Sequence, residues 1–383
     1  MRRQKPGTWT GDNINGHTYY APWLCLYENH EQIGKVLLRV SITYPYKLRN
    51  EKIQFIPPEG IKINLNPKNT DDNDTLIACV KDLKNKQIEI VCTQSKDDDR
   101  ILTVINSKNE VVGKLNIFRN SISVDLPNVR IIKILFRGSF IENARMFSLT
   151  NDESDQKGDF YNLSNNFSNW ESKVIRNQQC QEHTKLYLHQ CLVNYKSSLN
   201  SQVETVIVDL NVEKLIHNNV QKGNVVLFNE IKNKGKFEIV KKNNSTPSSN
   251  IEQTMEEYDY IKVKHQHIID IIETFFTNSH LNIAYLPYKM IEKQGEVAWA
   301  TYDKNIVCLC GDPTSFKNYM LAHEILHTLG LRHSFFEQEE ESNIYKKIMY
   351  EQGKTENLMD YKGDKYSTFK WQWEQIYENY KNK

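Results

Sequence analysis

The feature that most constrains this chain is the segment HEILHTLGLRH, which runs from His323 to His333. His323 and His327 are four residues apart, so on a helix their rings project from one face, one turn apart. The segment lies in an apolar stretch, and we expect a helix over about residues 315–331. Burying imidazoles in an apolar helix is costly unless a partner satisfies them, and two imidazoles in this arrangement can bind one metal ion.

A third metal ligand is expected because catalytic zinc usually takes three protein groups and keeps one position open. His333 lies six residues beyond His327, and a straight helix would carry it away from the metal. Gly330 stands between them, and glycine tolerates the positive φ that ends helices in a left-handed turn. We therefore expect the chain to turn back at Gly330 and to present His333 to the same zinc ion.

Glu324 is the candidate catalytic residue of this segment. It follows the first histidine directly, so its carboxylate can reach the fourth coordination position without binding the metal, as a general base for a zinc-bound water requires. The short pattern HExxH also occurs by chance in proteins without a metal. The additional glycine and histidine at the right spacing are two independent constraints and favour the zinc interpretation.

Composition excludes some other classes of function. The chain has 49 Lys and Arg residues against 48 Asp and Glu, a net charge of +1, and these residues are interleaved. This argues against nucleic acid as a partner. No apolar run is long enough to span a membrane, and the first residues lack the apolar segment of a signal peptide. Location stays open: inside the cell, export by a specialised bacterial system, or a trimmed sequence.

The cysteines give no sign of a second site. There are seven, they are dispersed, and none forms a CxxC pair. A chain of 383 residues does not depend on a disulfide framework. Cys308 and Cys310 would share one face of a strand, and we expect them to be core residues.

The two halves of the chain differ in pattern, which indicates an α+β fold with segregated halves. Residues 18–150 consist of short segments rich in Val, Ile and aromatic residues between turns, so we expect residues 1–150 to form an immunoglobulin-like β-sandwich. Nothing there clusters ligand-type residues, and its expected roles are packing, partner binding or delivery. The polar residues 151–173 are expected to be a linker.

Residues 174–383 are expected to form the catalytic domain, with mixed helices and strands. The patterns predict helices over 174–196 and 256–278 and a C-terminal helix over FKWQWEQIYENY. They predict strands at VETVIVDL, LNIAYLP, EVAWATY and NIVCLC.

HEILHTLGLRH resembles the HExxHxxGxxH signature of the metzincin metallopeptidases, and Ser334 is the residue that matrixins carry after it. Metzincins also have a downstream turn whose methionine lies beneath the metal. NLMDY resembles this turn, which implies that Met359 forms that floor. A tyrosine two residues later resembles astacins and serralysins and implies that Tyr361 stabilises the transition state. The family also places an edge strand above the cleft, here Glu296 to Tyr302, with which a peptide substrate pairs.

The chain departs from the family in some respects. The span from His333 to Met359 is long for a matrixin, and it contains a second candidate, Met349. No cysteine switch of the matrixin type and no archaemetzincin cysteine cluster is visible. TENLMDY followed by FKWQWEQ also resembles bacterial zincin-like proteins that carry β-rich N-terminal modules.

The resemblance implies a zinc metalloendopeptidase that hydrolyses protein or peptide substrates through a water activated by Glu324. Two alternatives stay open at this point. The chain could be a secreted effector, toxin or binding module whose zincin domain has unknown or lost activity, or a zinc hydrolase that acts on a bond other than a peptide bond. The sequence does not identify the substrate.

Overall fold

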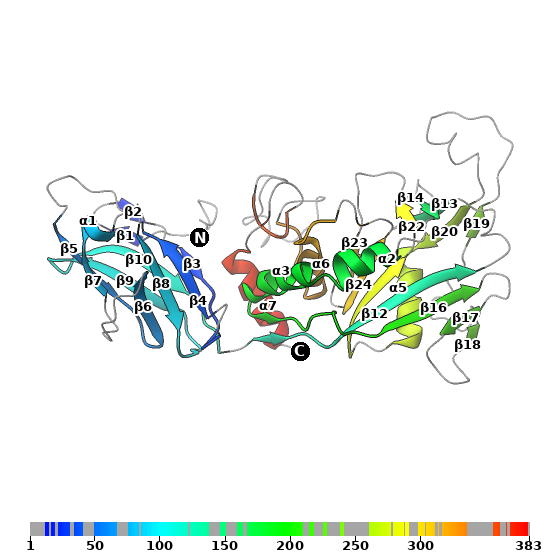
Figure 1. Ribbon diagram of the computed structural model, residues 1–383, viewed down its shortest axis with the longest axis horizontal. Coiled ribbons are helices and arrows are strands. Elements are labelled where there is room, and N and C mark those ends of the chain that lie inside the picture. Colours follow the sequence, from blue (N-terminus) through cyan, green and yellow to red (C-terminus); the bar gives the residue numbers. More distant parts are fainter. Residues whose placement is uncertain are drawn as a thin grey trace, which may run out of the picture. The chain divides into compact units, whose positions relative to one another are not determined.

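The computed structural model describes residues 12–14, 17–19, 22–30, 34–40, 50–66, 76–83, 86–121, 123–137, 146–150, 159–163, 167–209, 214–217, 225–227, 238–240, 260–276, 279–286, 288–290, 298–302, 304–310, 313, 316–334, 355–360, 365 and 368–381. This part of the chain mixes α and β structure, with many strands and few helices (Figure 1). Two compact units divide the chain. One comprises residues 1–125, 186–194 and 331–383, and the other comprises residues 126–185 and 195–330.

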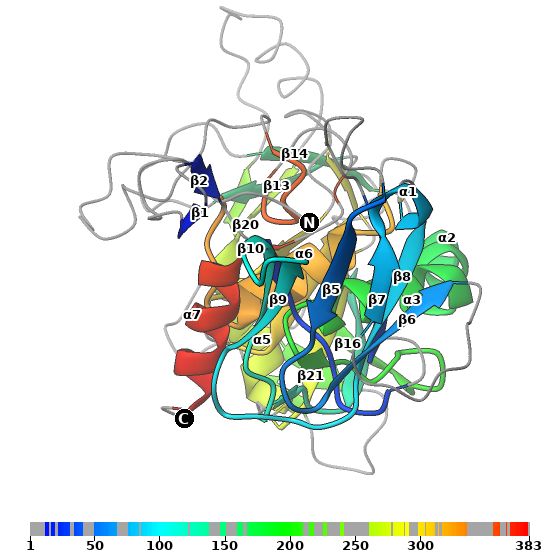
Figure 2. The same ribbon diagram turned by 90° about the vertical axis from the view of Figure 1, so that its left-hand side faces the viewer.

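The first unit is built mainly from two sheets. Their strands are β3 (Trp23–Leu24), β4 (Lys35–Arg39), β5 (Lys52–Ile56), β6 (Ile61–Asn66), β7 (Leu76–Cys79), β8 (Gln87–Cys92), β9 (Arg100–Asn106) and β10 (Val111–Ile117). One sheet has the order β3-β10-β9-β5-β7 and the other β4-β8-β6. Figure 2 labels the strands from β5 to β10. All pairs are antiparallel except β3 with β10. The unit also holds a short hairpin of β1 (Asp12–Ile14) and β2 (His17–Tyr19) and the single-turn helix α1 (Val80–Leu83).

The two sheets enclose one apolar core. Alternate residues point inward, as Ile53 and Phe55 do on β5 and Ile88 and Ile90 do on β8. These side chains belong to a single cluster of buried residues drawn from both sheets. Two sheets that pack face to face form a sandwich. This agrees with the sandwich-like N-terminal part expected from the sequence. Its immunoglobulin-like type stays a prediction.

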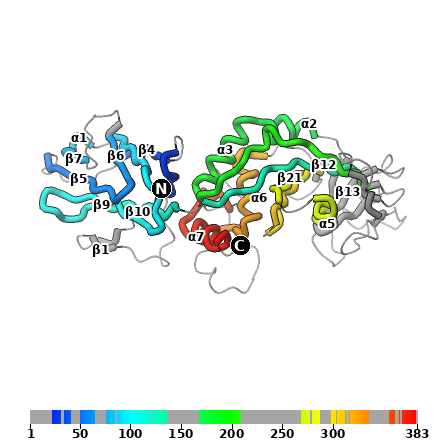
Figure 3. Tube along the Cα trace, turned by 90° about the horizontal axis from the view of Figure 1, so that it is seen from below, coloured from blue at the N-terminus to red at the C-terminus, as the bar shows by residue number. Residues whose placement is uncertain are grey.

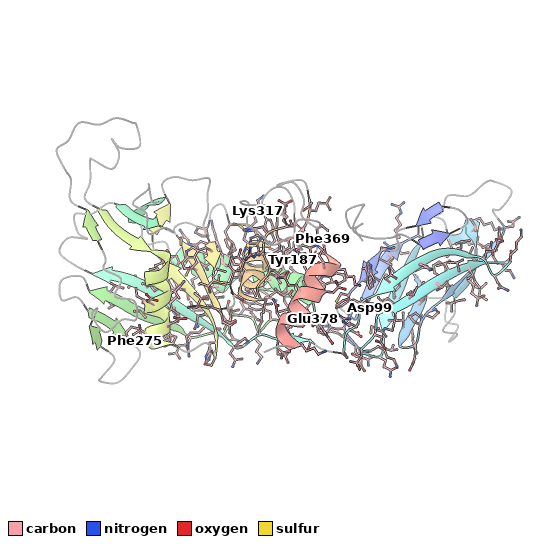
Figure 4. All side chains as sticks on the ribbon, turned by 180° about the vertical axis from the view of Figure 1, so that it is seen from behind. Asp99, Tyr187, Phe275, Lys317, Phe369 and Glu378 are labelled. Atoms are coloured by element: carbon pink, nitrogen blue, oxygen red, sulfur yellow. The ribbon has the colours of Figure 1, made fainter. Side chains whose placement is uncertain are left out.

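The C-terminal helix α7 (Lys370–Lys381) belongs to this first unit and packs against the sandwich. The rings of Trp373 and Phe118 meet at 5.6 Å between centroids. Arg119, next to Phe118, forms an ion pair of 3.8 Å with Glu378, which is labelled on the helix in Figure 4. The helix was expected from its sequence, but its packing partner was not, because periodicity does not identify what covers an apolar face.

The start of α7 is held by one lysine. The Lys370 ammonium lies 3.9 Å from the centroid of the Trp23 ring. It also pairs with Asp99 at 3.2 Å and with Glu374 at 2.9 Å. Its side chain is only 19% exposed, so these interactions are stronger than those of a surface pair.

We predict that Lys370→Ala lowers the free energy of unfolding by about 1–2 kcal/mol, because it removes a cation–π contact and two partly screened ion pairs. Chemical denaturation of the full chain measures this. Lys185→Ala, at an exposed position of the helix Gln178–His189, serves as the control and should stay within about 0.5 kcal/mol of wild type. Equal effects of the two changes would contradict the role of Lys370.

The second unit contains a seven-stranded sheet of order β18-β17-β16-β12-β21-β24-β23. Its strands are β12 (Val129–Arg137), β16 (Val203–Asp209), β17 (Lys214–His217), β18 (Val225–Leu227), β21 (Leu281–Leu286), β23 (Ala298–Ala300) and β24 (Ile306–Cys310). β12 pairs in parallel with β16 and β21, and β21 pairs in parallel with β24. At the edge, β23 runs antiparallel to β24. The sheet is therefore parallel in its centre, where strands are buried on both faces.

Helices and a smaller sheet complete the second unit. The helices are α2 (Phe167–Trp170), a π-helical turn (Glu171–Ile175), α3 (Gln178–His189), α5 (His265–Phe275) and α6 (Met320–Thr328). The last turn of α3 belongs to the first unit. The first unit also holds the paired strands β11 (Val124–Asp125) and β15 (Val193–Asn194). The smaller sheet combines β13 (Met146–Thr150), β14 (Asp159–Leu163), β19 (Glu238–Val240), β20 (Tyr260–Lys264) and β22 (Tyr288–Met290). In the described residues, no helix is both long and apolar enough to cross a membrane.

The structure departs from the sequence analysis at several elements. β12, expected with the strands of residues 1–150, lies in the centre of the seven-stranded sheet (teal in Figure 3). β14 falls inside the expected linker 151–173. The helix expected over 256–278 is shorter, because β20 precedes α5. Short apolar runs fit strands of either unit, so the pattern alone did not identify the partners of these strands.

Candidate metal centre

The helix α6 forms the base of the site. Every side chain from Leu321 to Thr328 is buried, and the helix packs on β23 and β24. It begins at Met320, later than the expected Ser315, because Phe316 and Met320 donate their backbone N–H groups to Pro313 and Lys317 in tight turns. Such a helix must satisfy any polar side chain that it buries.

The two histidines of α6 face each other. The Nε2 atoms of His323 and His327 lie 3.1 Å apart, with the ring planes at 85°. Their side chains are 5% and 6% exposed. Two nitrogens bound at about 2.0–2.1 Å to one zinc ion in tetrahedral geometry lie about 3.3 Å apart. The observed spacing therefore suits two ligands of one ion.

His333 completes the cluster. It is 6% exposed, and the ligand atoms of His323, His327 and His333 all lie within 4.8 Å of one another. The turn that brings it there is the one expected from the sequence. Gly330 has φ of +85°, and its N–H donates to the His327 carbonyl at 2.9 Å. The three imidazoles together could hold a metal ion.

A turn around Met359 holds the chain next to His333. The N–H and Oγ–H groups of Ser334 donate to the Met359 carbonyl at 2.8 and 3.3 Å. Met359 is fully buried, and its own N–H donates to Asn357 Oδ1 at 2.8 Å. The methionine turn proposed from the sequence is thus hydrogen bonded to the residue that follows the third histidine. Tyr361 lies outside the described residues.

This turn is also joined to the start of α7. The side-chain amides of Asn357 and Gln372 exchange two hydrogen bonds, of 2.9 and 3.2 Å. Gln372 Oε1 also accepts the backbone N–H of Phe369, labelled in Figure 4, at 2.8 Å. Both amides are fully buried. In the sequence, Asn357 stood out only as part of NLMDY and Gln372 only as part of FKWQWEQ; neither amide was assigned a role, because no local pattern shows that the two are partners.

A buried ion pair lies beside the methionine turn. Asp360 and Lys365 approach to 3.8 Å, with both side chains at 0% exposure. The ammonium of Lys365 also donates to the Thr355 carbonyl at 2.8 Å. Asp360 Oδ2 accepts hydrogen bonds from the N–H and Oγ–H of Thr355, at 2.9 and 2.8 Å. These bonds compensate in part for the desolvation of two charges.

We predict that Lys365→Met lowers the free energy of unfolding by about 3–5 kcal/mol, because it leaves the Asp360 carboxylate buried without its counter-charge. The double change Asp360→Asn with Lys365→Met should recover part of this loss, since no buried charge then remains. Denaturant unfolding of the full chain measures both, with Lys35→Met, whose lysine is 50% exposed, as the control. If the double variant lost as much unfolding free energy as the two single variants Asp360→Asn and Lys365→Met lose together, the two charges would not be coupled.

Glu324 lies on α6 beside His323 and is 6% exposed. It is close enough to β24 to affect Cys308. Burial raises the pKa of the Cys308 thiol well above its usual value, and the neighbouring Cys310 and the Glu324 carboxylate raise it further. A thiol with a raised pKa stays protonated and is a poor metal ligand. Cys308 and Cys310 are both buried, so they are core residues, as the sequence suggested.

Because the three histidines could hold one metal ion, we predict that one equivalent of Zn²⁺ or Co²⁺ binds to the chain and that His327→Ala weakens this binding by more than about 100-fold. Isothermal titration and the visible spectrum of the Co²⁺ form measure the two quantities. His280→Ala changes a histidine that is not part of the cluster and should bind metal as the wild type does. Unchanged affinity in His327→Ala would refute the site.

Comparison of the sequence with known proteins does not identify a family. No model of a protein family matches the chain, and no curated protein matches it. The case for a metal centre therefore rests on the three histidines and on the turn that brings the third of them to the other two.

Proposed function

We propose that this chain is a zinc-dependent endopeptidase in which His323, His327 and His333 hold the metal and Glu324 is the general base. The observation that carries the proposal is the convergence of three buried imidazoles, two of which stand on a helix that also bears the buried carboxylate of Glu324. Neutral imidazoles suit zinc, and three protein ligands with an open position are typical of catalytic rather than structural zinc sites.

The proposed chemistry assigns a distinct task to each group. Zinc, when bound, lowers the pKa of a water molecule to about 7 and polarises a carbonyl group. The Glu324 carboxylate takes the proton of the attacking water and later donates it to the leaving amine. Its burial among apolar residues of α6 and beside Cys308 keeps bulk water from competing for that proton. Tyr361 is proposed as an additional hydrogen-bond donor to the developing oxyanion.

The edge strand β23 favours a peptide as the substrate. It is the last strand of its sheet in the described part of the chain, and α6 packs against it. An extended peptide can add to such an edge through backbone hydrogen bonds. It would then lie along the strand nearest to the metal-binding helix, which is the arrangement that cleavage within a chain requires.

The metzincin assignment is part of this proposal. It is supported by the positive φ of Gly330 and by the hydrogen bonds between Ser334 and the Met359 turn. The first feature agrees with the chain reversal expected at Gly330, and the second brings NLMDY, which resembles the methionine turn of that family, next to the third histidine.

The decisive variant is Glu324→Gln, which keeps the shape of the side chain and removes its basicity. We expect it to bind zinc as the wild type does and to lose peptidase activity by a factor of about 10²–10⁴. Cleavage of a proteome-derived peptide library, with and without a chelator, measures this. Glu182→Gln, at an exposed position of α3, is the matched control.

Two results would contradict the proposal. Full activity in Glu324→Gln would remove the general base. Zinc binding by the wild type without chelator-sensitive cleavage would favour a binding module whose zincin domain has lost its activity.

A further inference from the structure

Tyr302 is held next to the candidate metal centre by a closed turn. It lies two residues beyond β23, and the preceding Thr301 is buried. The backbone N–H of Thr301 donates to the Ile306 carbonyl at 3.1 Å. Its Oγ–H donates to the Lys304 carbonyl at 3.1 Å. These bonds fix the backbone on which the Tyr302 side chain stands.

The ring of Tyr302 contacts a proposed metal ligand. Its centroid lies 5.3 Å from that of His327, with the planes at 78°, an edge-to-face arrangement that aromatic rings favour. His327 is buried, whereas Tyr302 remains 47% exposed. The tyrosine therefore contacts the buried histidine while about half of the residue stays exposed to solvent.

An exposed aromatic ring in this position is suited to contact a substrate. A peptide that pairs with β23 presents alternate side chains to the α6 side of the strand. Rigid aromatic surfaces provide large apolar contact at little entropic cost and dominate many recognition sites. The side chain closest to the metal is the one next to the cleaved bond, so it is the one that meets Tyr302.

We propose that Tyr302 determines cleavage specificity by packing against the substrate side chain next to the cleaved bond, and that it selects a large apolar or aromatic residue there. This inference rests on the proposed endopeptidase function. Loss of an apolar contact of this size changes discrimination by about 10–200-fold. The phenol hydroxyl is not required for this role, whereas the ring is.

The test uses the full zinc-loaded chain and peptides built around cleavage sites of the wild type. Each position that flanks the cleaved bond is set to Phe or to Ala, one position at a time, and kcat/KM is measured for each pair. We expect wild type and Tyr302→Phe to prefer Phe at one flanking position. In Tyr302→Ala this preference should fall at least about tenfold, because kcat/KM on the Phe peptide drops more than kcat/KM on the Ala peptide, while zinc affinity stays unchanged.

Tyr380→Ala, which removes a 39% exposed tyrosine of α7, is the control and should leave the preference unchanged. An unaltered preference in Tyr302→Ala would overturn the inference, and so would a loss of zinc affinity that lowers kcat/KM on both peptides alike. Wild-type cleavage that Glu324→Gln abolishes, together with an unaltered preference, refutes the role of Tyr302 alone. Absence of chelator-sensitive cleavage by the wild type refutes the proposed function and this inference together.

Discussion

The burial of three imidazoles in one cluster is the constraint on which the rest of the site depends. α6 is covered along its length, so His323 and His327 cannot point to bulk water. Polar groups in such a position destabilise a fold unless they find partners. The spacing of the two histidines and the turn at Gly330 direct their nitrogens and those of His333 to one point. A metal ion held at this point could satisfy all three, so the geometry that lowers the cost of burial is also the one that could bind metal.

The third histidine is positioned through the backbone that follows it. Ser334 binds the Met359 carbonyl, and the turn around Met359 is held by the amide of Asn357 and by the ion pair of Asp360 with Lys365. Buried polar networks whose members are satisfied fix a single geometry. These bonds explain how a segment without regular secondary structure can fix the position of His333.

The parts of this structure that follow a local rule were predictable from the sequence, and the parts that depend on distant partners were not. The i and i+4 histidines, the helix end at Gly330 and the strands β21 and β24 each follow from a pattern within a few residues. The placement of β12 does not, because an apolar strand fits either sheet. Lys365 was missed for a related reason: lysine is almost always exposed, and only the fold shows its buried acceptors.

The N-terminal sandwich has a structural role that a purely delivery-related interpretation omits. It belongs to the same compact unit as residues 331–383, and α7 packs on it through Trp373, Lys370 and the ion pair of Arg119 with Glu378. α7 is in turn bound by Gln372 to Asn357, in the turn of Met359. Contacts therefore run without interruption from the sandwich strands to the segment that follows His333. A partner of the sandwich would have to bind a surface that α7 leaves uncovered, because the surface beneath α7 already supports the C-terminal segment.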